Sequence, residues 1–371
     1  QYLCNIYITI IKYNHIFIFL NFKIFILRKK SFAFLYLYLC NMNIAQFIPY
    51  YPNANDKNFQ YDLAKHKEFY DNKMTPELGE TDNEKLYPQQ SIVSRFISPY
   101  TTQDVLLLYH EVGTGKTYAS TAISENFKRI RNMYNEPFNP TLLLVRSDTF
   151  IKNFIRQMPL KYDYYEPKLS APNSEIYNRR VKDLLRKYYE METWTKFLKV
   201  SSPLKRETLE NYEARLEKVV KPMWKEKFSN RVIIIDEIHN IKIQEHKKEK
   251  EEVEYLIKGG TRIAGPSTYQ KMHTFLHSVV NCKILLLSGT PMWDKPNEIA
   301  SIMNLILPLD NQFDSDTNFD SEYFHPNGSL LKGSVEKLKE KFKGKISYVR
   351  QTTSIVTKSI VGRINTWKDK E

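Results

Sequence analysis

Cysteine is scarce in this 371-residue chain, which contains only Cys4, Cys40 and Cys282. Two of the three lie within the first 41 residues, so a single cysteine belongs to the rest of the chain. One thiol can form neither a disulfide framework nor a four-ligand metal site. The sequence therefore excludes a disulfide-stabilised secreted domain and indicates a protein of the cytosol or the nucleus.

The first 41 residues contain no glycine, proline, aspartate, glutamate, valine or methionine. A membrane span needs roughly 18 to 20 apolar residues in a row. Polar residues interrupt every such window, namely Lys12, Asn14, His15, Asn21 and Lys23. A signal peptide is not indicated either, because no charged start leads into an apolar stretch with a small-residue cleavage site. We expect residues 1–41 to be an AT-rich leader that is not part of the native protein, with Met42 as the start; a membrane anchor is the alternative.

The formal net charge of the chain is +13. Five of the basic residues and no acidic ones lie in the first 41 residues, so the remaining 330 carry 50 basic and 42 acidic groups. A net charge of +8 on that part is compatible with a polyanionic partner and equally with an ordinary solvated surface.

A glycine-containing loop follows a short apolar run at residues 105–108. The run is typical of a buried strand, and the loop places Gly113, Thr114 and Gly115 directly before a predicted helix. The glycines let successive backbone N–H groups converge on a phosphate, and the helix adds the positive end of its dipole. The pattern predicts a phosphate-binding loop, or P-loop.

The two residues after the last glycine of the P-loop carry its chemistry. Lys116 is expected on the β- and γ-phosphates of ATP, and the hydroxyl of Thr117 on Mg²⁺. The usual pattern has another glycine at the position that His110 occupies. A glycine turn followed by a surface lysine is therefore the alternative interpretation.

A second site follows the β-branched run at residues 232–235, which is typical of a buried parallel strand. Asp236 and Glu237 stand at its carboxyl end, where open α/β sheets bind their ligands. Asp236 is the natural outer ligand for Mg²⁺, and Glu237 is the natural base to orient the attacking water. A solvated Asp-Glu pair is the alternative.

A third segment repeats the same design: an apolar run at 283–287 precedes Ser288, Gly289 and Thr290. The two hydroxyls could relay the state of the γ-phosphate to a neighbouring surface. Taken alone, the segment is an ordinary turn.

In this order and spacing, the three segments resemble the helicases and translocases of superfamily 2. Residues 110–117 match motif I, residues 236–239 match the DExH motif II, and residues 288–290 match motif III. The resemblance implies that Gln90 reads adenine and that His239 couples motif II to motif III. It also implies that residues 142–154 form motif Ia, where Ser147 and Asn153 would touch the nucleic-acid backbone.

Residues 296–307 resemble the helix that follows motif III in the Swi/Snf-like branch, where the glycine replaced by His110 is commonly absent. Residues 47–52 and 344–350 are similar to segments of the helicase-like transcription proteins of large cytoplasmic DNA viruses, among them poxvirus nucleoside triphosphatase I and the small subunit of the early transcription factor. The resemblance implies duplex DNA and a viral RNA polymerase or transcription complex as partners. It implies a viral factory, a virion or the nucleus as the location.

We expect an α/β fold: a RecA-like P-loop domain with a mostly parallel central sheet flanked by helices. The expected organisation is an N-terminal extension at 42–85, the RecA-like domain at 86–310 and a linker toward a second RecA-like lobe at 311–371. A helical insertion is expected at about 177–228. That insertion is either merely solvated or binds duplex or a partner.

The resemblance implies a DNA-dependent ATPase that couples ATP hydrolysis to translocation. The arginine finger of this superfamily comes from the second lobe and can contribute roughly 10³ to 10⁵ in rate. Because nothing after Arg350 resembles the motif that carries it, we expect weak ATP binding and poor hydrolysis by this chain alone. A strand-separating helicase, a non-catalytic nucleotide-binding module and a small-molecule P-loop kinase are the alternatives.

Overall fold

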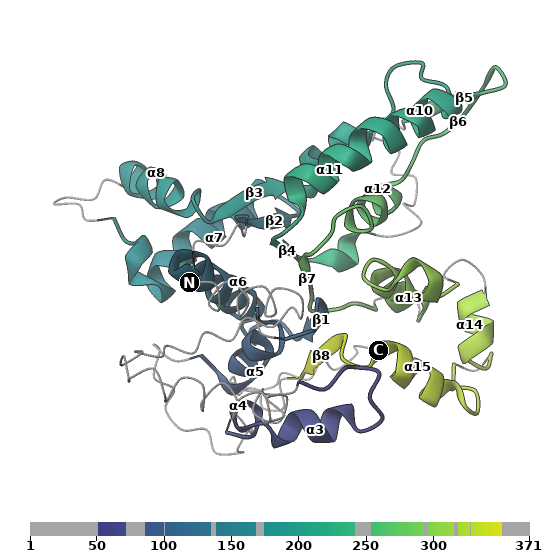
Figure 1. The fold of residues 1–371 in the computed structure, drawn as a ribbon. Helices are drawn as coiled ribbons and strands as arrows, with labels where there is room; N and C mark the ends of the chain where they lie inside the picture. The colour runs from purple at the N-terminus through teal and green to yellow at the C-terminus, as the bar shows by residue number, and fades with distance from the viewer. Residues whose placement is uncertain are drawn as a thin grey trace, which may run out of the picture.

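The computed structural model describes residues 51–71, 86–99, 101–134, 139–167, 174–241, 254–292, 296–314, 318–326 and 328–350. Its centre is a six-stranded sheet in the order β3-β2-β4-β7-β1-β8, in which every neighbouring pair is parallel (Figure 1). The strands are β1 (Val105–His110), β2 (Thr141–Val145), β3 (Tyr189–Thr193), β4 (Val232–Ile235), β7 (Lys283–Ser288) and β8 (Ile346–Val349). The predicted fold class is confirmed.

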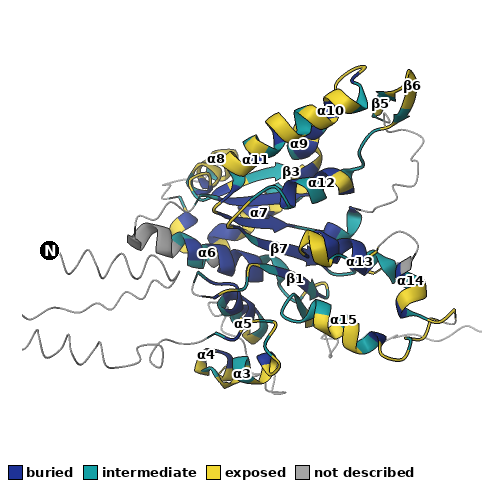
Figure 2. Cartoon of the chain, turned by 45° about the vertical axis from the view of Figure 1, so that its right-hand side comes forward, coloured by how far each residue is buried: buried dark blue, intermediate teal, exposed yellow. Residues whose placement is uncertain are grey.

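The central strands are apolar in their middle residues because helices cover both faces of the sheet. Every residue of β2 and β4 is buried, and Figure 2 shows this buried layer between more exposed helices. Alternate residues enter different cores: Leu107 packs in one cluster with Trp224 and Phe275, whereas Leu106 packs in the other with Phe127. Helices contribute to both clusters.

The cluster around Phe127 is covered by α5 (Pro88–Phe96), α6 (Lys116–Tyr134), α7 (Asp148–Lys161) and α8 (Ser174–Leu185), with α3 (Phe59–Lys65) and α4 (Lys67–Tyr70) beyond them. The cluster around Trp224 is covered by α9 (Trp194–Leu198), α11 (Lys221–Phe228), α12 (Thr268–Leu276), α13 (Asn297–Asn304) and α14 (Asn318–Tyr323), and partly by α15 (Ser334–Phe342). Short helical turns complete the described elements: η2 (Asp163–Tyr165), η3 (Lys199–Ser201), η5 (Ile238–Asn240) and η6 (Leu309–Asn311).

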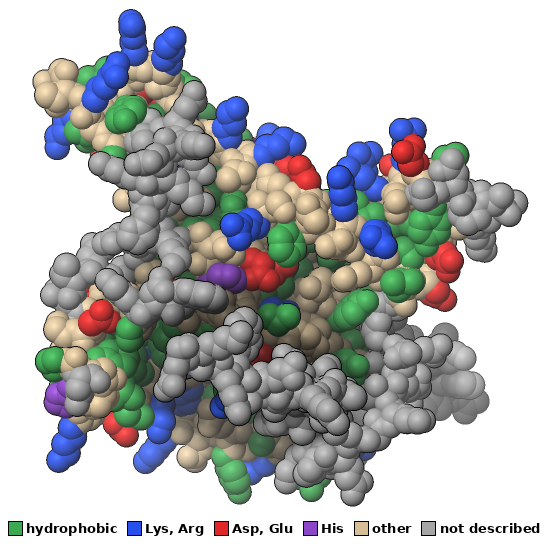
Figure 3. All heavy atoms as spheres, turned by 180° about the vertical axis from the view of Figure 1, so that it is seen from behind, with side chains coloured by type: hydrophobic (Ala, Val, Ile, Leu, Met, Phe, Trp, Pro, Cys, Tyr) green, Lys and Arg blue, Asp and Glu red, His purple; other side chains and the backbone are tan. Residues whose placement is uncertain are grey.

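An arm projects from the body (Figure 1). It consists of α10 (Leu209–Arg215), the π-helical turn η4 (Leu216–Val220), α11, and the hairpin of β5 (Tyr255–Lys258) and β6 (Thr261–Ala264). The hairpin closes through Gly259 and Gly260, whose φ values of 56° and 82° suit a two-residue turn that favours glycine. Basic side chains gather at the free end of the arm (Figure 3), where Lys205, Arg206 and Arg262 are exposed.

The outer part of the arm is fixed by a largely buried ion pair. Glu207 accepts hydrogen bonds from Nε and one terminal nitrogen of Arg215, both at 2.8 Å. Arg215 also donates to the backbone carbonyls of Val200 and Ser202. This two-pronged geometry holds the last turn of α10 against the loop that precedes the helix.

Two of the predicted segments contain a strand that the sequence did not predict. The insertion at 177–228 is not wholly helical, because β3 lies within it and joins the sheet beside β2. The sequence of β3 does not indicate a strand, because an edge strand needs only partial burial and can carry charged residues such as Glu190. In the structure, Glu190 forms an ion pair with Arg231. The segment 311–371 is not only a linker, because β8 pairs with β1. Sheet partners far apart in sequence leave no local signal for such pairing.

The predicted leader at 1–41 lies outside the described residues, and the extension at 42–85 is described only at 51–71, where α3 and α4 form. In the part of the chain that the structure describes, no helix is long and apolar enough to cross a membrane.

Candidate nucleotide-binding site

The loop between β1 and α6 has the backbone that the sequence predicts. Gly113 and Gly115 have φ values of 87° and 79°, in the left-handed region that favours glycine. A Cβ at position 115 would lie 2.2 Å from Nε2 of Gln90, so a side chain there is excluded by space as well as by conformation. Thr114, between the glycines, donates its hydroxyl to the carbonyl of Glu111 at 2.6 Å.

Gln90, predicted to read adenine, is buried against this loop. Its Nε2 donates to the carbonyl of Gly115 at 3.2 Å, and its Oε1 accepts from the backbone N–H of Tyr87 at 3.1 Å. The structure therefore brings Gln90 to the phosphate-binding loop, where it fixes the loop backbone. A role toward adenine stays a prediction.

Lys116 lies at the first position of α6 and turns back over the loop. Its Nζ donates to the carbonyl oxygens of His110 at 2.8 Å and Glu111 at 3.4 Å. Burial lowers the pKa of Lys116 below its ordinary value, whereas the carboxylates of Glu237 and Asp236 act to raise it. Motif III lies close by, since a Cβ on Gly289 would be 3.4 Å from the same Nζ.

The carboxylates of motif II follow β4 directly. The N–H of Asp236 still pairs with Leu144 of β2, and the chain then turns at Glu237, whose φ of 53° is left-handed. Asp236 Oδ1 accepts from the N–H of Glu237 at 2.9 Å. Burial, and then the charge of Glu237, raises the pKa of Asp236 to about 6. A buried carboxylate of this kind gains stability when a cation binds it, so it suits Mg²⁺ together with the hydroxyl of Thr117.

The side chain of His239 lies between motif II and motif III, and its coupling role stays a prediction. Its Nδ1 lies 3.1 Å from Oγ of Ser288 and 3.2 Å from Oε2 of Glu237. Oγ of Ser288 in turn accepts from the backbone N–H of Thr290 at 3.2 Å. A shift of the Glu237 carboxylate can therefore change the position of His239, and with it the hydrogen bonds of Ser288 and Thr290.

His110, the residue in place of glycine, is completely buried at the end of β1. Its Nε2 lies 2.8 Å from Oγ of Ser347 on β8, and its Nδ1 is buried with no hydrogen-bond partner among the described residues. Burial, reinforced by the charge of Lys116, lowers the pKa of His110 to about 4. The imidazole is neutral at pH 7 and links the P-loop strand to β8.

The predicted nucleic-acid residues lie at the end of β2. Ser147 is the residue before the first turn of α7, where its side chain makes no capping hydrogen bond, and Asn153 is exposed on that helix. Arg146 and Asn240, which were not among the predicted site residues, lie between this segment and motif II. Arg146 donates to Oδ1 of Asn240 at 2.9 Å. Their positions next to Ser147 and His239 were the only signal that could have found them.

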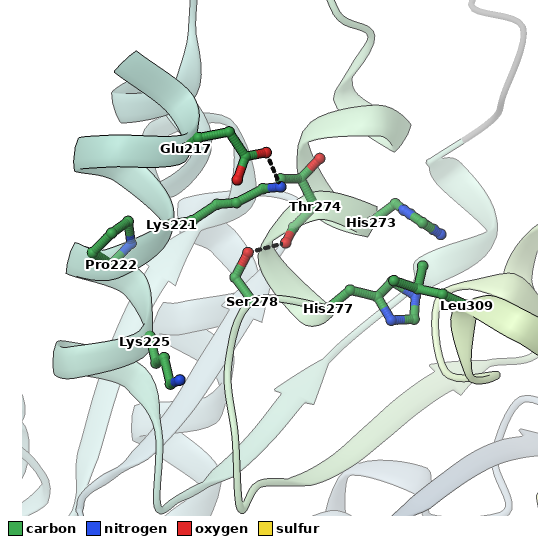
Figure 4. Close-up of a pocket in the computed structure, with 9 residues that line it drawn as sticks. All are labelled: Glu217, Lys221, Pro222, Lys225, His273, Thr274, His277, Ser278 and Leu309. Atoms are coloured by element: carbon green, nitrogen blue, oxygen red, sulfur yellow. Dashed lines mark hydrogen bonds and ion pairs between the residues drawn. The ribbon is translucent and has the colours of Figure 1, made fainter. Parts of the chain in front are cut away.

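A cavity of about 620 Å³ lies elsewhere, between α11 and α12 (Figure 4). It is lined by Glu217, Lys221, Pro222, Lys225, His273, Thr274, His277, Ser278 and Leu309, and includes none of the predicted site residues. Glu217 forms an ion pair with Lys221. His273 hydrogen-bonds with Gln312, and His277 with the carbonyl of Asn304. The cavity is a gap beside the arm helix and not part of the nucleotide site.

Comparison with known proteins agrees with the geometry. Residues 83–292 match the family described as "Type III restriction enzyme, res subunit". A candidate helicase of Invertebrate iridescent virus 3, 087L, is 27% identical over 86% of this chain and 29% of its own length. A candidate ATP-dependent RNA helicase of Acanthamoeba polyphaga mimivirus, R563, is 26% identical over 81% of this chain and 48% of its own length. The chain thus spans less than half of these relatives.

Among solved structures, the Sulfolobus solfataricus SWI2/SNF2 ATPase core in complex with dsDNA aligns with a TM-score of 0.41 and 17% identity. The alignment covers 74% of this chain and 46% of the other. This likeness is too distant to support the Swi/Snf-like branch, which stays a prediction. The family match covers motifs I, II and III together, and the chain belongs to the Type III restriction enzyme res-subunit family, as a helicase-type ATPase domain of superfamily 2.

Proposed function

We propose that this chain is the ATP-binding lobe of a motor that couples ATP hydrolysis to movement along duplex DNA or to its remodelling. One observation carries the proposal. The three motifs follow three neighbouring strands, since motif I follows β1, motif III follows β7 and motif II follows β4. Parallel strands present their carboxyl ends at one edge of a sheet, which is where such sheets bind ligands.

The donor set at this edge suits ATP with Mg²⁺. Lys116 would exchange its hydrogen bond to the carbonyl of His110 for bonds to the β- and γ-phosphates. Thr117 and Asp236 would hold the metal. The metal would supply positive charge to the phosphates as they separate. Glu237 would orient the attacking water. His239, whose Nδ1 lies 3.2 Å from Oε2 of Glu237, would pass the change to Ser288.

Nucleic acid would lie along the start of α7, where Ser147 and Asn153 are placed after the end of β2. Duplex DNA is the proposed track, and the similarity at residues 47–52 and 344–350 supports a role beside a viral RNA polymerase. A strand-separating helicase is the second candidate, because the relatives carry helicase names.

The proposal is tested by measuring ATP hydrolysis by the full-length protein with no nucleic acid, duplex DNA, single-stranded DNA and duplex RNA. The full-length protein is used because this chain alone is expected to hydrolyse ATP poorly. We expect the largest stimulation with duplex DNA. Displacement of the third strand of a triplex without unwinding of a forked duplex would support translocation, and the reverse pattern would support the helicase. Hydrolysis that no nucleic acid stimulates would contradict both. Co-purification with the viral polymerase subunits tests the proposed partner.

A further inference from the structure

A line of polar contacts, two hydrogen bonds and one close approach, connects the predicted nucleic-acid surface with the predicted catalytic carboxylate. Arg146, next to Ser147, donates to Oδ1 of Asn240 at 2.9 Å. Nδ2 of Asn240 lies 3.1 Å from Nε2 of His239. Nδ1 of His239 lies 3.2 Å from Oε2 of Glu237. The four side chains thus form one connected path from the end of β2 to motif II.

The chemistry of the groups fixes the direction of each bond. Arginine only donates, so the atom of Asn240 that faces it must be the carbonyl oxygen. The amide nitrogen of Asn240 then faces His239 and also only donates. Nε2 of His239 must therefore be the unprotonated nitrogen, and its proton must reside on Nδ1. That proton points at the carboxylate of Glu237 and at Oγ of Ser288.

Asn240 acts on Glu237 by a second route. Its Nδ2 donates to the carbonyl of Glu237 at 3.1 Å, and its backbone N–H donates to the same oxygen at 3.0 Å. These two bonds close the turn in which Glu237 takes its left-handed conformation. The orientation of the Asn240 amide therefore sets both the backbone of Glu237 and the tautomer of the histidine beside it.

Arg146 is well placed to report on a phosphate. It is exposed, and among the described residues its guanidinium makes this one hydrogen bond. A guanidinium has five N–H donors, so an exposed one with a single bond keeps donors that can bind a phosphate oxygen. The amide of Asn240 is held in this orientation by Arg146 at its oxygen and by the carbonyl of Glu237 at its nitrogen. A phosphate that draws the guanidinium away from Asn240 removes the first of these two contacts and leaves the amide less firmly held.

We propose that Asn240 is a positioning residue that couples nucleic acid bound at Arg146 to Glu237, through the tautomer of His239. The inference rests on the proposed function and adds to it the path by which nucleic acid acts on the ATP site. Neither Asn240 nor Arg146 needs to touch ATP.

The test compares the full-length protein with its Arg146→Ala, Arg146→Lys and Asn240→Asp variants. The first measurement is the affinity for adenylyl-imidodiphosphate with and without a short DNA duplex. We expect the duplex to change that affinity by about fivefold or more in the wild type, the lower end of typical coupling between sites, and hardly at all in Arg146→Ala and Asn240→Asp. Arg146→Lys keeps a donor and should restore part of the coupling.

The second measurement is the pair of imidazole ¹⁵N shifts of His239 without nucleic acid. The wild type should show the Nδ1–H tautomer. Asn240→Asp replaces the donor with an acceptor of the same shape and should move the proton to Nε2 or protonate both nitrogens. Arg156→Ala removes another exposed cation of α7 and is the control for Arg146→Ala. Asn281→Asp adds the same charge as Asn240→Asp, but just before β7, at the amino ends of the strands. Both controls should behave like the wild type.

Unchanged coupling and unchanged ¹⁵N shifts in Asn240→Asp would overturn the inference. So would an Arg146→Ala variant that binds duplex more weakly to the same extent with and without nucleotide, because Arg146 would then be a phosphate contact and nothing more. Failure of the proposed function looks different: the wild type would bind nucleotide without hydrolysing it, while the ¹⁵N shifts of His239 would still report on Asn240.

Discussion

Nζ of Lys116 donates a 2.8 Å hydrogen bond to the carbonyl oxygen of His110, at the end of the strand that leads into the P-loop. The ammonium group is thus satisfied by the backbone of its own loop and lies beside Gly289 of motif III. A phosphate that binds here must replace this bond with a stronger, charge-assisted one. Nucleotide binding therefore changes the contacts of β1 and motif III together.

Lys116→Ala should weaken nucleotide binding by about 10- to 150-fold, since hydrogen bonds to charged groups contribute about 1.5 to 3 kcal/mol. Titration with a fluorescent ATP analogue measures it. Lys337→Ala, an exposed lysine on α15, is the matched control and should bind like the wild type. Equal affinities for the two variants would show that Lys116 is a surface lysine after a glycine turn.

Asp236→Asn should stabilise the fold at neutral pH. The pKa of Asp236 in the fold is about 6, above its ordinary 3.8, so the folded state binds more protons between these values and stability falls as pH rises through that window. The variant removes a cost of up to about 3 kcal/mol at pH 7 and little at pH 4. Urea unfolding at both pH values checks this, with exposed Asp310→Asn as the control. A gain that is equal at both pH values would contradict the account.

The same raised pKa predicts that Mg²⁺-dependent nucleotide binding weakens as pH falls from 7 to 5, because a protonated carboxyl no longer attracts the metal. Binding measured in the presence of EDTA should show a smaller pH dependence. An identical pH profile with and without Mg²⁺ would remove Asp236 as the metal ligand.

His110→Gln should make the protein less sensitive to acid. The pKa of His110 is about 4 in the fold and 6.5 ordinarily, so the unfolded state binds more protons between these values and stability is lost as pH falls from 6.5 to 4. The loss attributable to His110 is on the order of 3 kcal/mol. Urea midpoints across this range should fall less steeply in the variant than in exposed His325→Gln.

Tyr189→Phe should destabilise the protein by about 1 to 3 kcal/mol, because it takes a donor from a buried carboxylate. The hydroxyl of Tyr189 lies 2.6 Å from Oε1 of Glu125, and the residue is buried. Tyr164 donates to the same carboxylate but is 51% exposed, so water can replace its hydroxyl in Tyr164→Phe. A larger loss for Tyr164→Phe in urea unfolding would contradict this reasoning.

Much of the site was predictable because its signals are local. A glycine before Lys116 and two carboxylates after a β-branched run each need only a few adjacent residues to be recognised. The order of these motifs then predicted a parallel sheet, and the structure has one.

The features that sequence reasoning missed depend on pairing across the sheet. β3 and β8 are edge strands with mixed polarity, so neither has the apolar run that identified β4. The proposed role of Asn240 depends on its hydrogen bond with Arg146, which lies 94 residues earlier in the chain. No periodicity within one segment contains that information.

The central claim, that Glu237 orients the water that attacks ATP, is tested most directly by Glu237→Gln in the full-length protein with saturating nucleic acid. The amide keeps the shape of the side chain but cannot accept a proton. We predict that ATP affinity stays within about twofold of the wild type while turnover falls by about 10² to 10⁴, the usual contribution of a general base. Unchanged turnover with intact ATP binding would contradict the account and favour a module that holds nucleotide without hydrolysing it.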